Sequence, residues 1–219
     1  EHDVTGASMA ATVSGANTNF DRLRYISERT EIGERREAVL SVTIPERPGA
    51  FKAFCHAIGK RNVTEFNYRY ETAAEARVFV GLTVTPGDES LNALQDALRQ
   101  KGYRVLDMTD NETAKLHLRH MVGGRLSKVI SDEMVFRVEF PERPGSLLQF
   151  LTALGNEYSI SLFHYRNHGA AFGRILVGMQ VPEGKRANLR RALNRSGYRF
   201  WEETDNPAYR EYLGPAERT

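Results

Sequence analysis

The chain repeats itself, and this repeat constrains the fold more than any other feature of the sequence. The segment Pro-Glu-Arg-Pro-Gly stands at 45–49 and again at 141–145, an offset of 96 residues. A second match follows at almost the same offset, where the residues Phe-Asn-Tyr-Arg at 66–69 correspond to Phe-His-Tyr-Arg at 163–166. Each copy covers roughly 80 residues, so the chain of 219 residues is expected to form two similar subdomains.

Each copy shows the same order of predicted strands and helices. Apolar residues alternate along 39–44, which indicates a strand with one buried face, and they recur at helical spacing along 51–58. A hairpin and a second helix follow, and this helix ends at Gly102 before a short last strand. The second copy repeats this order from residue 135 onward. The expected class is α+β, with two tandem ferredoxin-like βαββαβ subdomains, antiparallel sheets and helices on one face.

Two details of the helix ends are also predicted. Pro48 and Pro144 are expected just inside the first helix of each copy, where the missing N–H of proline is tolerated. Asp110 and Asp205 are expected to cap the N-terminus of a trailing helix behind each copy.

Domain boundaries follow from the extent of the repeat. Residues 1–16 are polar and rich in small side chains, and they are expected to be a tail that is either disordered or foreign to the natural sequence. Residues 17–37 have a helical pattern, belong to neither copy, and are expected to be a linker helix from the end of a preceding domain. The remaining boundaries are subdomain 1 at 38–121, a connector at 122–132 and subdomain 2 at 133–219.

The composition argues against several classes of protein. The 30 basic and 28 acidic side chains leave a formal charge of +2, which is too small for a typical nucleic-acid surface. No apolar run approaches the roughly 18 residues that a membrane span needs. The single cysteine, Cys55, excludes an internal disulfide and favours a reducing, cytoplasmic compartment.

The sequence contains no catalytic motif with useful spacing. Cys55 is the obvious nucleophile to consider, but its repeat partner is Leu151 on the predicted buried face of a helix, which favours an apolar core cysteine. The six histidines form no recognised ligand motif; His117 and His120 could share a helix face but have no carboxylate or cysteine companion. We therefore predict no catalytic residue and no metal site in this chain.

Three repeated features are candidates for a ligand site, and each has a structural alternative. The Glu-Arg-Pro-Gly turn offers N–H groups at a helix N-terminus, where a carboxylate could bind, or it could be only a strand-to-helix turn. On the Phe-x-Tyr-Arg strand, Arg69 and Arg166 could clamp an anion or couple the copies, or they could pair with solvent or a neighbour. Gly81 and Gly178 could mark the close approach of a ligand or another backbone, or only a bulge. The three features are expected at the same end of each subdomain.

Long segments of the chain resemble one known family. They include "SGANTNFDRLRYISERTEIGERREAVLSVTIPERPGAFKAFC", "VTEFNYRY", "AKLHLRHMVGGR", "ISLFHYRNHG" and "ETDNPAYREYL". From about Ser14 to the C-terminus, the sequence resembles the C-terminal regulatory part of biosynthetic threonine dehydratase, also called threonine ammonia-lyase. The resemblance implies two ACT-like subdomains that bind isoleucine as feedback inhibitor and valine as opposing effector.

The resemblance also implies a catalytic domain that is not part of this chain. In the family that domain holds pyridoxal phosphate on a lysine and converts threonine to 2-oxobutanoate and ammonia, the step that commits carbon to isoleucine. This chain itself is expected to hold no cofactor. Its expected partners are the catalytic domain of the parent chain and further copies of itself, because the family is typically tetrameric. No nucleic acid and no membrane is expected as a partner.

The effector site of the family corresponds to the turn and the aromatic-arginine strand of each copy. The leading candidates are Tyr68, Arg69, Tyr165 and Arg166, and the other predicted site residues are Phe66, Asn67, Phe163, His164, Glu46, Gly49, Phe51, Glu142, Gly145 and Leu147. In this hypothesis the effector carboxylate meets helix N–H groups or an arginine, and the ammonium meets backbone carbonyls or Glu46, Asn67 or Glu142. The branched side chain enters an apolar gap near Phe51, Phe66, Leu147 or Phe163. The sequence does not say which copy binds which amino acid.

Three other functions remain compatible with parts of the pattern. A free-standing ACT-type sensor that regulates a separate partner would have the same fold. An RNA-recognition module also uses βαββαβ with aromatic strands, but "RVFVGLTV" lacks the glycine and aromatic pattern of such modules. A free-standing enzyme on a ferredoxin-like scaffold is not excluded by fold alone.

Overall fold

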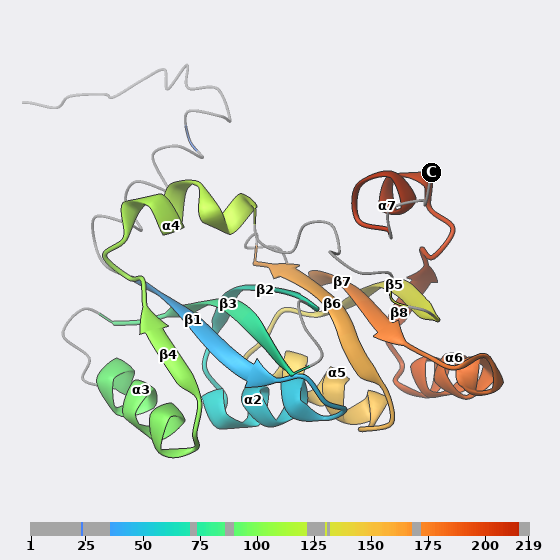
Figure 1. Ribbon diagram of the computed structural model, residues 1–219, viewed down its shortest axis with the longest axis horizontal. Helices are drawn as coiled ribbons and strands as arrows, with labels where there is room; N and C mark the ends of the chain where they lie inside the picture. The colour runs from blue at the N-terminus through green and yellow to red at the C-terminus, as the bar shows by residue number, and fades with distance from the viewer. Residues whose placement is uncertain are drawn as a thin grey trace, which may run out of the picture.

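Figure 1 shows the computed structural model of the chain, in which one antiparallel sheet lies between two layers of helices. The structure describes residues 23, 36–70, 74–85, 90–121, 130, 132–167 and 172–214. The predicted tail at 1–16, nearly all of the predicted linker helix at 17–37 and most of the connector at 122–132 lie outside the described residues. Within the described ranges, none of the helices combines the length and the apolar character that a membrane crossing requires.

The two repeats form the two predicted βαββαβ units. The first unit consists of β1 (Glu37–Pro45), α2 (Ala50–Ile58), β2 (Val63–Arg69), β3 (Glu75–Thr83), α3 (Ser90–Gln100) and β4 (Arg104–Asp107), followed by α4 (Glu112–Leu116) and the 3-10 helix η1 (Leu118–His120). The second unit consists of β5 (Glu133–Pro141), α5 (Ser146–Leu154), β6 (Ser159–Arg166), β7 (Phe172–Gln180), the 3-10 helix η2 (Glu183–Lys185), α6 (Arg186–Arg195) and β8 (Arg199–Glu202), followed by α7 (Pro207–Tyr212). The predicted fold class is thus confirmed, and β1 begins at Glu37, the last residue of the predicted linker helix.

The two units share one sheet, which the repeat alone did not predict. The sheet has eight strands in the order β4-β1-β3-β2-β6-β7-β5-β8, so the units meet where β2 pairs with β6. This pairing is antiparallel and sets Asn67 opposite His164, which are equivalent residues of the two repeats. The two subdomains are therefore related by an approximate two-fold rotation about the centre of this seam.

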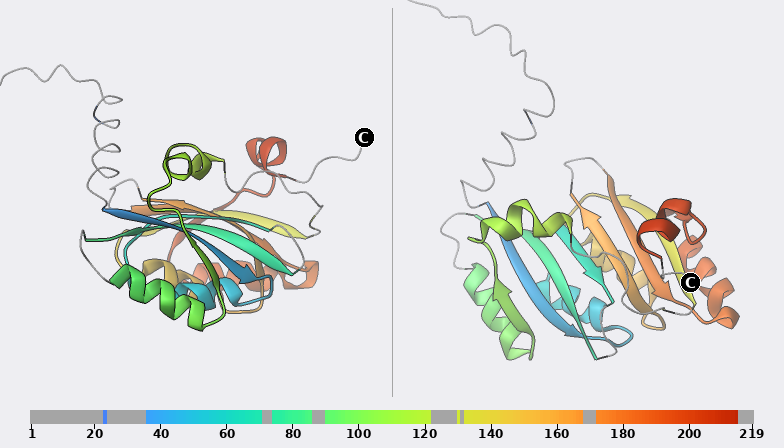
Figure 2. Two further views of the ribbon diagram at one scale, coloured as in Figure 1. Left: turned by 60° about the vertical axis from the view of Figure 1, so that its left-hand side comes forward. Right: turned by 45° about the horizontal axis from the view of Figure 1, so that its top comes forward.

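The helices cover the two faces of the sheet unequally. Figure 2 shows α2, α3, α5 and α6 on one face and the short helices α4 and α7 on the other. The main core lies between the sheet and the four longer helices, and it runs across the seam through Phe51, Phe66 and Phe163. Smaller apolar clusters lie under the short helices, such as Val39 and Phe79 with Ala114 of α4.

The first helix of each unit begins after the predicted proline. Helix α2 starts at Ala50, behind Gly49, whose φ of 81° lies in the left-handed region. Pro48 is therefore in the turn that precedes the helix, and Pro144 is in the same position before Gly145. The prediction that these prolines lie inside the helices was wrong, because the glycine reverses the backbone between proline and helix.

The trailing helices are capped one residue later than predicted. The side chain of Asn111 accepts the N–H of Ala114 at the start of α4, and Asn206 has the same role in α7. The predicted caps, Asp110 and Asp205, lie just outside the helices. Asparagine is as good an N-cap as aspartate, so local preference did not decide between the two positions.

Candidate binding pockets at the seam between the subdomains

Two pockets lie at the seam, and each is built from both subdomains. Pocket 1 lies between the turn at 45–52 and the end of α5 with the following segment. Pocket 2 lies between the turn at 142–148 and the end of α2 with the following segment. The two pockets are equivalent sites of the repeat: residues that line one correspond to residues that line the other, as Leu151 in pocket 1 corresponds to Cys55 in pocket 2.

Nine of the predicted site residues line these pockets. They are Glu46, Gly49, Phe51 and Tyr68 in pocket 1, and Phe66, Glu142, Gly145, Leu147 and Tyr165 in pocket 2. Five other predicted site residues, all within the described part of the chain, line neither pocket: Asn67, Arg69, Phe163, His164 and Arg166. Both Glu-Arg-Pro-Gly turns therefore lie at a pocket, whereas the arginines of the Phe-x-Tyr-Arg strands do not.

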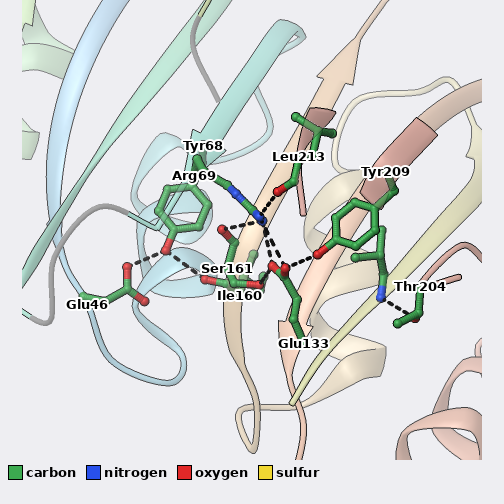
Figure 3. A network of polar contacts seen from close by, with 10 residues as sticks. Glu46, Tyr68, Arg69, Glu133, Ile160, Ser161, Thr204, Tyr209 and Leu213 are labelled. Carbon is green, nitrogen blue, oxygen red and sulfur yellow. Dashed lines mark hydrogen bonds and ion pairs between the residues drawn. The ribbon is translucent and has the colours of Figure 1, made fainter. Parts of the chain in front are cut away.

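Each pocket contains a tyrosine hydroxyl bonded to the glutamate of the turn. The hydroxyl of Tyr68 lies against Glu46 Oε2 and 2.8 Å from the carbonyl oxygen of Ile160, as Figure 3 shows. In pocket 2 the hydroxyl of Tyr165 donates to Glu142 Oε1. Burial raises the pKa of Glu46, although its hydrogen bond with Tyr68 works in the opposite direction. Burial and the neighbouring glutamate also raise the pKa of each tyrosine, so both hydroxyls remain protonated donors.

A helix N-terminus and cationic side chains border each pocket. Helices α2 and α5 begin behind a glycine, and no described side chain caps either N-terminus. The first N–H groups of an uncapped helix carry partial positive charge. Arg47 and Lys52 add positive charge at pocket 1, and Arg61 and Arg143 add it at pocket 2. Together with the glutamate and the apolar walls, these groups match the chemistry of a zwitterionic amino acid with an apolar side chain.

The free space in the pockets is small. The cavity volume is about 20 Å³ in pocket 1 and about 30 Å³ in pocket 2. One water molecule needs roughly 10–15 Å³ on this measure, so each pocket has room for only a few atoms. An amino-acid side chain that enters either pocket would therefore have to displace side chains of the pocket walls.

Arg69 lies on the opposite face of the sheet, in a buried polar network. Its Nη1 donates to Glu133 Oε1 over 2.6 Å and its Nη2 donates to the carbonyl oxygen of Leu213 over 2.8 Å. Ser161 and Tyr209 also donate to the carboxylate of Glu133, and Figure 3 shows that Tyr68 and Arg69 point away from one another. Arg69 thus joins β2 of the first subdomain to β5 and the end of α7 in the second.

The two strand glycines belong to this same polar face. A Cβ on Gly81 would lie 2.8 Å from Glu37 Oε1, and a Cβ on Gly178 would lie 2.8 Å from Glu133 Oε1. The groups that approach the glycines are therefore side chains of the chain itself, namely a carboxylate and the hydroxyl of Thr64 or Ser161. The alternative of a bulge also holds, because the neighbouring strands β2 and β6 shift register beside Gly81 and Gly178. The prediction that the turn, the arginine and the glycine lie together was wrong, because successive residues of a strand point to opposite faces.

The first subdomain holds its buried carboxylate with a different arginine. Thr64 Oγ1 donates to Glu37 Oε1 over 2.5 Å, and Arg119 Nη2 donates to the same oxygen over 2.9 Å. Burial alone would lower the pKa of Arg119, but the hydrogen bonds and charges of Glu37 and Glu65 raise it. Glu37 is thus paired within its own subdomain, whereas Glu133 is paired across the seam.

Several pocket residues escaped the sequence analysis because they come from the opposite subdomain. Leu154, Tyr158 and Ile160 complete pocket 1, and Arg61 completes pocket 2. Cys55 is buried, as predicted for a core residue, yet it also lines pocket 2. Among the described residues, no group of three His, Cys, Asp or Glu side chains could hold a metal ion.

The duplicated βαββαβ units define this chain as a tandem pair of ferredoxin-like subdomains. The family described as the C-terminal regulatory domain of threonine dehydratase matches at residues 28–118 and 124–213, and the chain belongs to this family.

Three relatives of the chain are threonine dehydratases. The biosynthetic L-threonine dehydratases of Burkholderia multivorans and Escherichia coli are 49% and 48% identical, over 96% and 97% of this chain. The mitochondrial threonine dehydratase of Saccharomyces cerevisiae is 40% identical over 97% of this chain and 38% of its own length. The chain spans 41% of the length of each of the two bacterial relatives. Among solved structures, the regulatory subunit of aspartate kinase from Thermus thermophilus is 16% identical and aligns with 74% of this chain and 92% of its own length. The TM-score of this alignment is 0.28, which is too low to support a conclusion about the fold.

Proposed function

We propose that this chain is the allosteric part of a cytoplasmic biosynthetic threonine dehydratase and binds isoleucine and valine in pockets 1 and 2. Isoleucine acts as the feedback inhibitor and valine as the opposing effector. The parent enzyme converts threonine to 2-oxobutanoate and ammonia, and its catalytic domain, not this chain, supplies pyridoxal phosphate. That catalytic domain and further copies of the parent chain are the proposed partners. Family membership and the chemistry of the pockets support this function.

The observation that carries the proposal is the same set of groups in both pockets. A carboxylate of the turn, Glu46 or Glu142, is placed to accept the effector ammonium once the tyrosine hydroxyl moves away. The N-terminus of α2 or α5, with Arg47 or Arg143, is placed to bind the effector carboxylate. Apolar side chains of both subdomains form the remaining wall and suit a branched aliphatic side chain.

A difference in affinity between isoleucine and valine does not by itself explain opposite effects, which require two conformational states of the protein. The two amino acids differ by one methylene, which is worth only about 1–3 kcal/mol in an apolar pocket. An effector shifts a conformational equilibrium only through its different affinity for the two states. Because each pocket is built from both subdomains, occupancy of a pocket changes how the subdomains fit together at the seam.

A thermal-shift titration with isoleucine, valine and threonine tests the proposal. A ligand that binds only the folded chain must raise Tm, so isoleucine and valine are expected to raise it and threonine to have a smaller effect. Glu46→Gln or Glu142→Gln removes a charged partner of the ammonium and should weaken binding roughly 10- to 100-fold. Glu157→Gln, an exposed change of the same charge, is the matched control. If neither amino acid shifts Tm, the proposal has to be abandoned for the chain as it stands.

A further inference from the structure

The two pockets share an aromatic wall. Phe51 lines pocket 1 and Phe66 lines pocket 2, and the centroids of these two rings are 4.9 Å apart. Phe51 also contacts the ring of Tyr68 in pocket 1 at 5.5 Å, and the ring of Phe163 at 4.8 Å. A displacement of the Phe51 ring toward Phe66 therefore also displaces the Phe66 ring.

The rings have little room to move independently. Phe66 and Phe163 are both 0% exposed and Phe51 is 5% exposed. A close-packed interior transmits a displacement, because no void is available to absorb it. Since the cavities measure only about 20 and 30 Å³, an aliphatic side chain of several atoms that enters pocket 1 presses on its walls. One of these walls is Phe51, and the ring packed behind it, Phe66, is a wall of pocket 2.

The shared wall is not symmetric. The repeat partner of Phe51 is Leu147, which lines pocket 2 with an aliphatic side chain. The aromatic contact between the pockets thus depends on one residue of the first subdomain. The asymmetry suggests Phe51→Leu as a test variant, because leucine already occupies the equivalent position, Leu147, at pocket 2.

We propose that Phe51 and Phe66 couple the two pockets, so that an amino acid bound in one pocket weakens binding in the other. A ligand in pocket 1 presses Phe51 against Phe66 and reduces the space in pocket 2, and a ligand in pocket 2 has the reverse effect. The proposal rests on the proposed function and adds its regulation, since mutual exclusion of two effectors lets each oppose the other. Thermodynamic linkage requires the same factor in both directions.

Calorimetric titration of the chain with isoleucine, alone and at a series of fixed valine concentrations, tests the coupling. We expect valine to weaken isoleucine binding by about fivefold or more, and isoleucine to weaken valine binding by the same factor. The effect must level off once the valine pocket is full. An effect that grows without limit would show competition for one pocket and would overturn the proposal.

Matched variants assign the coupling to the aromatic wall. Phe51→Leu should reduce the coupling to less than about twofold, measured against the affinity of the same variant for each amino acid alone, and Phe66→Leu is the second variant should the first not fold. Leu147→Phe, the reverse change at the equivalent position, should retain the coupling.

The possible failures can be told apart. If neither amino acid binds, the proposed function fails and the coupling fails with it. If both bind with affinities that do not depend on each other, the coupling is wrong and the proposed function stands. If the coupling is present but Phe51→Leu and Phe66→Leu both retain it in full, the role of the aromatic wall is wrong.

Discussion

At the scale of single residues, two buried carboxylates explain why glycine interrupts two apolar strands. Glu37 and Glu133 are equivalent in the repeat, and each lies beside the glycine of a neighbouring strand, Gly81 or Gly178. A carboxylate in the interior must be paired and hydrogen-bonded, which requires space for its partners. The glycines supply that space, so their role is structural.

Gly81→Ala should therefore destabilise the fold and not act on ligand binding directly. The added methyl group would clash with Thr64 Oγ1 and lie 2.8 Å from Glu37 Oε1. Overpacking of this kind lowers the free energy of unfolding by about 1–3 kcal/mol, measured by urea denaturation. Gly184→Ala is the control, because no described atom lies within 4 Å of its Cβ position. Unchanged stability together with lost amino-acid binding would instead favour the ligand role that the sequence left open.

At the scale of elements, β2 links a pocket to the polar face of the sheet. Tyr68 faces pocket 1, and the next residue, Arg69, holds Glu133 and the end of α7. Both side chains of the Arg69–Glu133 pair are almost completely buried, at 6% and 4% exposure. A buried ion pair is costly to break from one side, because the remaining charge has no partner.

Arg69→Met should lower the free energy of unfolding by about 3–5 kcal/mol, measured by urea denaturation, because Glu133 then remains buried without its cation. The double change Arg69→Met with Glu133→Gln should recover part of this loss, since both charges are removed. Arg104→Met is the control, because its pair with Glu75 is exposed and should contribute less than about 1 kcal/mol. Equal effects of Arg69→Met and Arg104→Met would contradict a buried, paired role for Arg69.

The order of elements could be predicted from the sequence, but the seam could not. Apolar periodicity and the repeat gave each strand and helix, because one buried face leaves a clear pattern. In strand β2 the polar residues Glu65 and Asn67 alternate with the aromatics Phe66 and Tyr68, which is typical of a strand with one solvent face. Both residues are nevertheless buried, because Arg119 and the neighbouring subdomain cover them. Since the β2–β6 pairing was not evident, pocket residues from the opposite subdomain were missed.

At the scale of the whole molecule, the two subdomains form one folding unit. Strand β2 pairs with β6 along Glu65–Arg69 and Leu162–Arg166, and a single apolar core runs across this seam. Neither subdomain can separate without exposing Phe51, Phe66 and Phe163 to water. Units that share a core are expected to unfold together.

Scanning calorimetry should therefore show one transition in which the calorimetric and van't Hoff enthalpies agree. Leu94→Ala, a core change far from the seam in α3, should lower the single Tm and not split the transition. A split into two transitions in the unchanged chain would show that the subdomains fold independently and that the seam is weak.

Pairing β2 with β6 also determines which parts of the sheet remain open to other chains. A second copy cannot add a strand at β2 or β6, because each already lies between two neighbours. The outer strands β4 and β8 have four residues each and carry charged residues at both ends, Arg104 with Asp107 and Arg199 with Glu202. Short, charged edge strands resist the addition of a further strand. Joining the subdomains within one chain thus protects the sheet from edge-to-edge aggregation and leaves other surfaces for assembly.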